Sequence, residues 1–264
     1  MAEFFCLMTE LAFLDPNPSG SPGVLLLHGL GVNASSWTLQ FPPLIEAGFR
    51  PLAPDAPGFG ASRYDGRGWS LKRVAAAMTD LLHELVIGPV HVVGISMGAA
   101  VAQQFTLDYP NKVKRLVLVS AFAALRPEQL SGWLYFLRRA LLVSFKGIPA
   151  QAEFVSRRLF PAPGQEALRK LLIEQVTQAD PRAYRAAMRA LALFDTRRRL
   201  RQITAPTLVI GGANDGTVSP SAQKILAEGI PDTRQVIIPG GGHAVSVDHP
   251  EEFNRALLEF LCAP

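Results

Sequence analysis

Short apolar runs and longer amphipathic segments alternate along the chain. The short runs are rich in Val, Leu and Ile and lie at 24–28, 50–54, 90–95, 115–120, 207–211 and 234–238. Because most of these runs are continuously apolar rather than alternating, they predict strands buried on both faces, as in a parallel sheet. The segment 19–23, Ser-Gly-Ser-Pro-Gly, has the composition of a turn and indicates a connection between early strands.

The longer segments have the 3.6-residue period of helices. One apolar stripe extends over 71–85, and Ser70 directly before it is a suitable N-cap. Near the end of the chain, Asp248 precedes Pro250 and two acids, which predicts a helix capped by Asp248 that buries Phe253, Leu257 and Phe260. Alternating strands and helices predict a doubly wound, mostly parallel α/β sheet with right-handed crossovers.

The segment 122–195 breaks this alternation. It contains helical patterns and no convincing strand, and the predicted helices cover 127–145, 150–159, 165–178 and 181–194. A helical insertion between two core strands usually covers a site rather than forming an independent domain. We therefore expect a core made of 1–121 and 196–264, with 122–195 as a helical cap.

Composition suits a globular protein with a substantial core: of 264 residues, 48% are hydrophobic and 18% are charged. The apolar runs are too short to span a bilayer, so no membrane span is expected. The N-terminus has an acid at position 3 and lacks the basic start of a secretory signal, so a cytoplasmic location is expected.

The formal net charge of +4 comes from dispersed arginine clusters at 138–139, 157–158 and 197–201, without interleaved aromatic residues. This pattern favours solvated helix faces, and no nucleic-acid partner is expected. Cys6 and Cys262 form no CxxC pair and have no metal-site spacing. Two reduced thiols are expected, although a bridge between the ends of the chain stays open.

The motif Gly94-Ile95-Ser96-Met97-Gly98 follows a predicted strand and precedes a small-residue segment that could start a helix. By itself Ser96 could be a helix cap. In the pattern G-x-S-x-G, however, a sharp strand-to-helix turn exposes the serine hydroxyl as a nucleophile. The free N–H groups at the start of the next helix favour negative charge at that point. Ser96 is therefore the candidate nucleophile.

A serine nucleophile needs a base and an orienting acid. Of five histidines, His243 lies in a glycine-rich loop after the last predicted strand, whereas the other four have structural explanations: His28, His83, His91 and His249. Asp215 follows the strand at 207–211, so both side chains are expected at the carboxyl edge of the sheet. Asp195 and Asp248 look like helix-end residues, and a turn-forming role for Asp215 is the alternative.

Two backbone N–H groups are expected to hold the oxyanion of a tetrahedral intermediate. One belongs to Met97, the residue after the nucleophile. The other belongs to Leu30, in the loop His28-Gly29-Leu30-Gly31 that follows the strand at 24–28. His28 itself is expected to be structural and to hydrogen-bond this loop.

At this point the sequence resembles the α/β-hydrolase superfamily over nearly its whole length. The matching segments, in the superfamily's order, are HGLGVNASSW (28–37), PDAPGFGAS (54–62), GISMGAA (94–100), PTLVIGGANDGTVSP (206–220) and PGGGHAVSVDHPEEF (239–253). The resemblance implies the triad Ser96, Asp215 and His243, and it implies that 122–195 is the cap. It is strongest to small cap-bearing carboxylesterases, enol-lactonases and carbon–carbon bond hydrolases. No cofactor or metal is expected, the partner is a small ester, and the protein is a monomer or homodimer.

The leading hypothesis is hydrolysis of carboxylic esters with short to medium acyl chains through an acyl-enzyme. A lactonase or carbon–carbon bond hydrolase with the same triad is the alternative; it would need an arginine for a substrate carboxylate, and Arg126, Arg138 and Arg157 are candidates. A non-catalytic small-molecule receptor on the same fold is the less favoured reading. Apolar cap residues suggest a hydrophobic pocket, although at least half could form the cap's own core: Trp133, Phe136, Leu137, Leu141 and Leu142.

Overall fold

Eight strands form one sheet in the computed structural model, which describes residues 3–6, 11–126 and 130–263. Their order is β1-β2-β4-β3-β5-β6-β7-β8. β1 (Glu3–Cys6) and β2 (Leu11–Leu14) are antiparallel to their neighbours, and the remaining strands are parallel. These are β3 (Gly23–Leu27), β4 (Arg50–Pro54), β5 (Val90–Ile95), β6 (Val113–Val119), β7 (Thr207–Gly212) and β8 (Thr233–Ile238).

All six strands predicted from the apolar runs are confirmed, and so is the mostly parallel sheet. β1 and β2 were not among the predicted runs. Each has four residues, too few for a pattern of apolar positions to stand out. The chain leaves β3 toward β4 on one side and later enters β5 on the other side. The crevice at the carboxyl end of β3 and β5 is therefore the expected ligand site of such a sheet.

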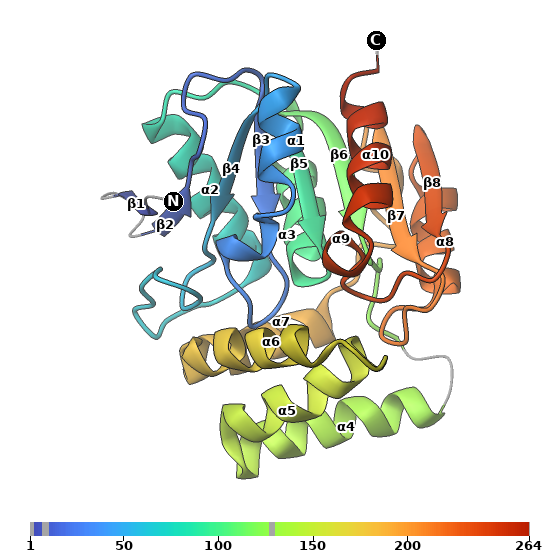
Figure 1. Ribbon diagram of the computed structural model, residues 1–264. Helices are drawn as coiled ribbons and strands as arrows, with labels where there is room; N and C mark the ends of the chain where they lie inside the picture. The colour runs from blue at the N-terminus through green and yellow to red at the C-terminus, as the bar shows by residue number, and fades with distance from the viewer. Residues whose placement is uncertain (1–2, 7–10, 127–129, 264) are drawn as a thin grey trace.

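Helices cover both faces of the sheet and form two buried apolar clusters. α2 (Leu71–Glu84) and α3 (Met97–Asp108) pack on one face, and α8 (Pro220–Gly229) contributes Leu226 to the same cluster. α1 (Phe41–Glu46) and α10 (Pro250–Leu261) cover the other face, which is turned toward the viewer in Figure 1. These helices cover the faces of the sheet and not the edge at the carboxyl ends of the parallel strands. The candidate site and the insertion lie at that edge.

The two predicted helix starts had different outcomes. Ser70 caps α2 as predicted, because its hydroxyl accepts a hydrogen bond from the Arg73 N–H. The prediction that Asp248 caps α10 is wrong, since His249 is the N-cap residue and Asp248 ends the short helix α9 (Val245–Asp248). The Asp248 carboxylate instead accepts from the Gly242 N–H at 2.9 Å and contacts His249 Nδ1 at 3.1 Å.

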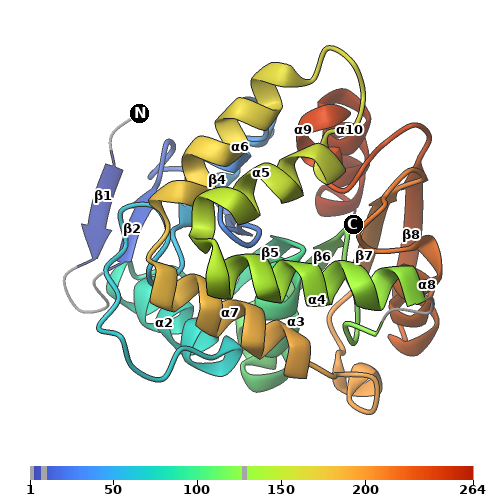
Figure 2. The same ribbon diagram turned by 90° about the horizontal axis from the view of Figure 1, so that it is seen from below.

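Four α-helices lie between β6 and β7 in the described part of the chain, and we call them the insertion. They are α4 (Leu130–Phe145), α5 (Gly147–Leu159), α6 (Glu166–Gln178) and α7 (Pro181–Leu193). Their helical nature is confirmed; residues 127–129, predicted to begin the first helix, lie outside the described residues. Figure 1 shows the insertion beyond the lower end of the sheet, and Figure 2 shows it from below.

Hydrogen bonds tie the insertion to loops of the core. The Asp180 N–H before α7 donates to the Gly58 carbonyl at 2.8 Å. On α6, Gln175 Nε2 donates to the Ser35 hydroxyl at 2.9 Å. Both core loops lie beside the carboxyl ends of the strands, so these bonds hold the insertion over that edge.

Two further sequence expectations concern membrane spans and thiols. Within the described residues, we find no helix with both the length and the apolarity needed to cross a bilayer. Cys262 carries a free, exposed thiol at the end of the chain.

His91, buried inside β5, makes the fold sensitive to acid. Burial lowers its pKa from the ordinary 6.5 to about 4, helped by the charges of Lys114 and Arg115. The imidazole of His91 binds a proton near pH 6.5 in the unfolded chain but only near pH 4 in the folded protein. The free energy of unfolding therefore falls as the pH drops through this window. Replacing His91 by Leu should shrink the stability loss between pH 7 and pH 5 by about 2 kcal/mol. Urea unfolding at both pH values measures this, and an unchanged difference would contradict it.

Candidate active site

Ser96 stands on a strained turn between β5 and α3. β5 ends at Ile95 and α3 begins at Met97, so the strand and the helix are joined through this one residue. Its φ of 54° and ψ of −107° lie in a region that non-glycine residues rarely adopt. The predicted strand-to-helix turn at Ser96 is therefore confirmed.

The glycines on either side of Ser96 make this turn possible. A Cβ atom at Gly94 would collide with the backbone of Gly98, and one at Gly98 would collide with the carbonyl of Leu27. Strand β5, helix α3 and neighbouring strand β3 can approach this closely because both positions lack side chains. The two glycines thus fix the close packing that supports the turn.

His243 and Asp215 come together from two neighbouring strands. Asp215 lies in the loop after β7, and His243 lies in the loop after β8. His243 Nδ1 is 2.9 Å from Asp215 Oδ2 and 3.1 Å from Oδ1. Asp215 also accepts from the backbone N–H groups of Thr217 and Val218, each at 2.8 Å. Both side chains are buried, so the carboxylate fixes the orientation of the imidazole.

The pKa of the Asp215 carboxyl lies below its ordinary value. Burial acts to raise this pKa, but the charge and hydrogen bond of His243 and the two backbone N–H groups outweigh it. The carboxylate is therefore ionised at neutral pH. Its contribution to stability is complete above the ordinary pKa and is lost only as the pH falls through the lowered pKa of the folded state.

The backbone around His243 is held by further buried groups. The Ser120 hydroxyl, directly after β6, donates to the His243 carbonyl at 2.8 Å. On the preceding residue, the Gly242 N–H donates to Asp248. The sequence analysis assigned no role to Ser120 and did not foresee that this hydroxyl supports the histidine loop.

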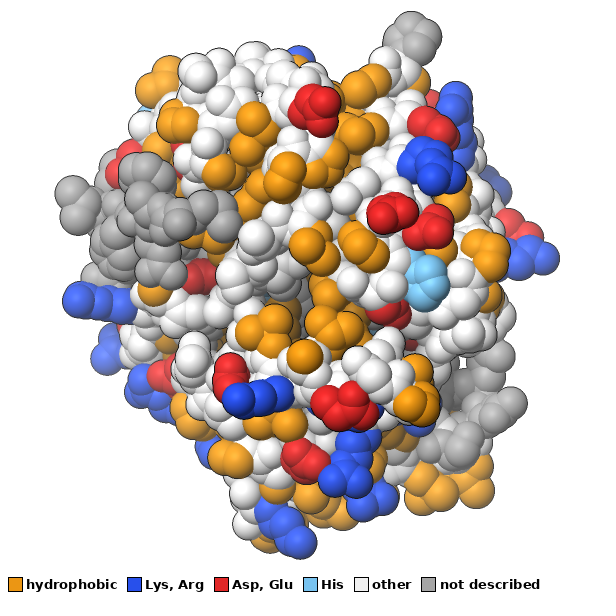
Figure 3. All heavy atoms as spheres, in the orientation of Figure 1, with side chains coloured by type: hydrophobic (Ala, Val, Ile, Leu, Met, Phe, Trp, Pro, Cys, Tyr) orange, Lys and Arg blue, Asp and Glu red, His pale blue; other side chains and the backbone are white. Residues whose placement is uncertain are grey.

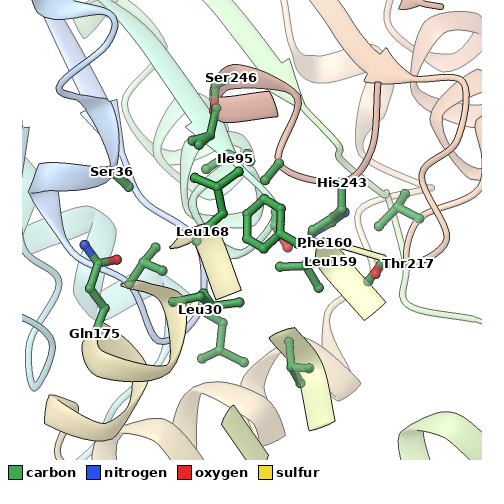
Figure 4. Close-up of a pocket in the computed structure, with 18 of the residues that line it drawn as sticks. Leu30, Ser36, Ile95, Leu159, Phe160, Leu168, Gln175, Thr217, His243 and Ser246 are labelled. Atoms are coloured by element: carbon green, nitrogen blue, oxygen red, sulfur yellow. The ribbon is translucent and has the colours of Figure 1, made fainter. Parts of the chain in front are cut away.

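Ser96, His243 and Leu30 line one cavity of about 470 Å³, which we call the catalytic cavity. Figure 4 shows the His243 ring directed into the same space as Leu168 and Phe160. Most other lining side chains are apolar, and several come from the insertion: Val155, Leu159, Phe160, Leu168, Leu171, Leu172 and Leu191. Figure 3 shows hydrophobic side chains near the middle of the surface that faces the viewer in Figure 1.

The two residues whose N–H groups the sequence predicts as oxyanion donors lie at the start of α3 and in the wall of the catalytic cavity. Met97 is the first residue of α3, so its N–H lacks an acceptor within the helix. Leu30 belongs to the loop after β3 and lies in the cavity wall. His28 supports this loop: its Nε2 accepts from the Ala56 N–H at 2.9 Å, which leaves Nδ1 protonated and donating to the Gly29 carbonyl at 2.8 Å. Burial lowers the pKa of His28, so the ring stays neutral.

The apolar residues that the sequence suggested for the pocket lie mostly elsewhere. Phe136 lines the catalytic cavity, but Trp133, Leu137 and Leu141 are 54%, 55% and 48% exposed. Leu142 is half-buried and is not part of the cavity lining. These residues share α4, whose inward face is narrow, so hydrophobicity alone could not identify it. The insertion's part of the lining comes mainly from α5 and α6, whose role the sequence did not reveal.

The predicted arginines also lie outside the catalytic cavity. Arg138 stacks on the ring of Phe154, and Arg157 pairs with Glu153 at 2.7 Å. Arg126, paired with Asp195 at 4.0 Å, lines a neighbouring cavity instead. Arg139 is the arginine in the lining of the catalytic cavity. The sequence grouped it with Arg138 as a solvated helix face, because adjacent residues on a helix cannot be assigned to faces without their neighbours.

In the part of the chain that the structure describes, no three His, Cys, Asp or Glu side chains gather closely enough to hold a metal ion. The cluster at the carboxyl edge of the sheet contains one hydroxyl, one imidazole and one carboxylate. Such a set performs nucleophilic and acid–base chemistry.

The sheet order, the strained serine turn and the histidine–aspartate pair define a class of hydrolase. Residues 24–256 match the family described as alpha/beta hydrolase. The chain therefore belongs to the alpha/beta hydrolase family.

Two relatives and one solved structure illustrate what the chain is similar to. RutD of Variovorax paradoxus (strain S110), to which carbamate hydrolysis is provisionally ascribed, is 35% identical over 92% of this chain and 93% of its own length. The 2-hydroxy-6-oxononadienedioate/2-hydroxy-6-oxononatrienedioate hydrolase of Klebsiella pneumoniae subsp. pneumoniae is 29% identical over 92% and 88%. A thermophilic esterase from Thermogutta terrifontis superposes with a TM-score of 0.83 at 28% identity, covering 95% and 92%. Family and relatives together support hydrolase activity.

Proposed function

We propose that the protein hydrolyses carboxylic esters through an acyl-enzyme formed on Ser96. The observation that carries this proposal is the buried hydrogen bond between His243 and Asp215, 2.9 Å long, at the cavity that Ser96 also lines. A carboxylate that binds Nδ1 leaves Nε2 free to accept a proton. An imidazole held by a carboxylate, in a cavity that a strained serine turn also lines, is the arrangement that serine acylation requires.

The proposed reaction uses each group once in acylation and again in deacylation. His243 takes the proton of Ser96 as the hydroxyl attacks the ester carbonyl, and the N–H groups of Leu30 and Met97 stabilise the oxyanion. His243 then donates the proton to the departing alcohol. Water, activated by the same imidazole, releases the acid, while Asp215 holds the ring and stabilises its charged form.

The size and lining of the catalytic cavity support short to medium acyl chains. A volume of about 470 Å³ and mainly apolar walls suit a small hydrophobic acid or alcohol. We propose that residues 122–195 act as the cap, because α5 and α6 provide much of this wall. A chain-length series of p-nitrophenyl esters that peaks at long acyl chains would contradict the assignment.

A lactone or a carbon–carbon bond is the second candidate substrate. The Klebsiella relative is named for hydrolysis of a 2-hydroxy-6-oxo dioate, and its resemblance to this chain favours testing that chemistry. The same serine and histidine can serve either reaction. Turnover of lactones or vinylogous diketones that exceeds ester turnover would favour this candidate.

A labelling experiment tests the proposed nucleophile. A fluorophosphonate probe should label the native protein once, and peptide mass spectrometry should place the label on Ser96. Labelling should follow the same time course as loss of p-nitrophenyl butyrate turnover, because both need the activated hydroxyl. Heat-denatured protein is the control and should stay unlabelled. A label on another serine, or ester turnover that survives full labelling, would refute the assignment.

A further inference from the structure

A second cavity adjoins the catalytic cavity inside the insertion. Its volume is about 490 Å³, and residues of both α4 and α7, which Figure 2 shows from below, line it. The two cavities share part of their walls: Leu30, Leu125, Phe136, Arg139 and Leu191. A molecule whose ester group lies at Ser96 can therefore extend past Leu30 toward this second cavity.

Among the residues that the structure describes, arginine supplies all the charge of this second cavity. Four guanidinium groups line it, and no described Asp or Glu does: the charged residues are Arg126, Arg139, Arg185 and Arg189. The rest of the wall is largely apolar, with Trp133, Phe136, Val143 and Met188 among its residues. Apolar walls with charges of one sign make an environment for an amphipathic anion.

Three of these arginines have no carboxylate beside them in the part of the chain that the structure describes. Among the described residues, no Asp or Glu oxygen lies within 4.0 Å of a guanidinium nitrogen of Arg139, Arg185 or Arg189, whereas Arg126 contacts Asp195 at that distance. Arg185 and Arg189 are one helical turn apart on α7 and are exposed, so water solvates them. Arg139 is half-buried, and its charge lacks that compensation.

Neutral groups hold the Arg139 guanidinium in place. The amide oxygen of Gln151, in the orientation that its neighbours require, accepts from Arg139 Nε at 2.7 Å and from Nη2 at 3.2 Å. Nη2 also lies 3.5 Å from the Tyr184 hydroxyl, and the guanidinium carbon is 5.6 Å from the centre of the Tyr135 ring. These contacts hold the planar guanidinium group of Arg139 in one orientation and leave its positive charge unbalanced. A charged donor fixed in this way is preorganised to bind an anion.

We propose that Arg139 binds a carboxylate on the substrate, distant from the scissile ester. The proposal rests on the proposed function and narrows its substrates to esters with a free carboxylate at the far end, such as half-esters of dicarboxylic acids. Arg185 and Arg189, at the exposed part of the cavity, attract such anions from solution. Arg139 then selects them at the junction of the two cavities.

A carboxylate suits this site better than a phosphate. At the junction the anion meets Phe136 and Leu191, so it loses much of its hydration. A monoanion costs less to desolvate than a phosphate dianion, and one half-buried guanidinium can balance one negative charge. Among the described contacts, Gln151 and Tyr184 take Nε and Nη2 of Arg139, so Nη1 is the nitrogen that donates to the carboxylate.

Paired esters of equal length test this selection. Monomethyl adipate and methyl hexanoate present the same ester, but only the first has a distal carboxylate. We expect the native protein to prefer monomethyl adipate in kcat/KM. Arg139→Gln should lower that preference about 10- to 100-fold, mainly through KM for monomethyl adipate, and should affect methyl hexanoate far less. Arg139→Lys should retain part of the preference, because it keeps the charge and loses the fork.

The matched control is Arg157→Gln, which removes an exposed arginine of the insertion that pairs with Glu153 outside both cavities. It should leave both esters unchanged. A native-like circular dichroism spectrum and a cooperative thermal transition report that Arg139→Gln is folded. If that variant does not fold, exposed Arg189→Gln gives a second measurement and should raise KM for monomethyl adipate about 3-fold. Equal losses on both esters, or no preference in the native protein, would overturn the proposal.

Calorimetric titration of the native protein with hexanoate separates this proposal from the proposed function. Hexanoate should bind, and Arg139→Gln should weaken its affinity at least about 10-fold, whether or not any ester is turned over. If no ester is hydrolysed but this loss is seen, the carboxylate site stands and the esterase proposal fails. Tighter binding of pentyl phosphate than of hexanoate would overturn the choice of a carboxylate.

Discussion

Ser96→Ala is expected to lower kcat/KM for p-nitrophenyl butyrate by about 10⁴-fold or more. The substitution removes the oxygen that forms the acyl-enzyme and leaves His243 with no proton to take. The remaining oxyanion N–H groups and the cavity can still bind the ester, so a small rate above that in water should persist. Initial rates at several substrate concentrations measure the loss, which should lie in kcat.

Ser221→Ala is the matched control for this variant, because it removes the hydroxyl of an exposed serine on α8, away from the cavities. It should keep native kinetics. Thermal unfolding of Ser96→Ala should show a midpoint no lower than that of the native protein, since alanine does not add strain to the φ of 54°. A Ser96→Ala variant with native turnover would show that another group carries the chemistry.

The turn at Ser96 was predictable because its determinants are local. A buried strand, two glycines at fixed spacing and a small-residue helix start all lie between residues 90 and 100. The meeting of Asp215 and His243 was also predictable in outline. Parallel strands have one carboxyl edge, so residues directly after β7 and β8 must come to the same side. The 2.9 Å contact depends on the lengths of two loops, which no pattern of residues determines.

Which side chains of the insertion face the catalytic cavity could not be predicted from the sequence. Four helices were evident from their period, but each helix has several apolar positions that can face the core, the cavity or solvent. Arg138 and Arg139 are adjacent, yet the first stacks on Phe154 while the second lines two cavities. The angle at which α4 crosses its neighbours decides this difference. That angle arises from packing between helices and leaves no mark in the local sequence.

Asp248 illustrates a competition between two roles of one carboxylate. Its position before a proline and two acids favours a helix cap, and its distance of six residues from Gly242 gives no hint of a contact. In the folded chain, the Gly242 N–H of the glycine-rich loop lies beside Asp248 and donates a hydrogen bond to its carboxylate. A buried N–H without an acceptor costs about 1–3 kcal/mol, comparable with or greater than the usual gain from one cap. The tertiary contact therefore wins.

Asp215→Asn is expected to lower kcat for p-nitrophenyl butyrate by about 10⁴-fold, although the side chain keeps its shape. The amide can turn its N–H₂ group toward His243 Nδ1 and donate where the carboxylate accepts. Nε2 then carries the ring proton and cannot take the one on Ser96. The amide also lacks the negative charge that stabilises the protonated imidazole during the reaction. Stopped-time assays with concentrated enzyme are needed to measure the remaining rate.

Asp195→Asn is the matched control, because this carboxylate pairs with Arg197 at 2.5 Å and does not line the catalytic cavity. Its removal should leave kcat unchanged, which shows that loss of an acid as such has no effect. Asp215→Asn should also leave KM nearly native, since the carboxylate touches His243 and not the ester. If Asp215→Asn instead raised KM and kept kcat, Asp215 would shape the cavity rather than set the tautomer of His243, and the acid of the triad would have to be sought elsewhere.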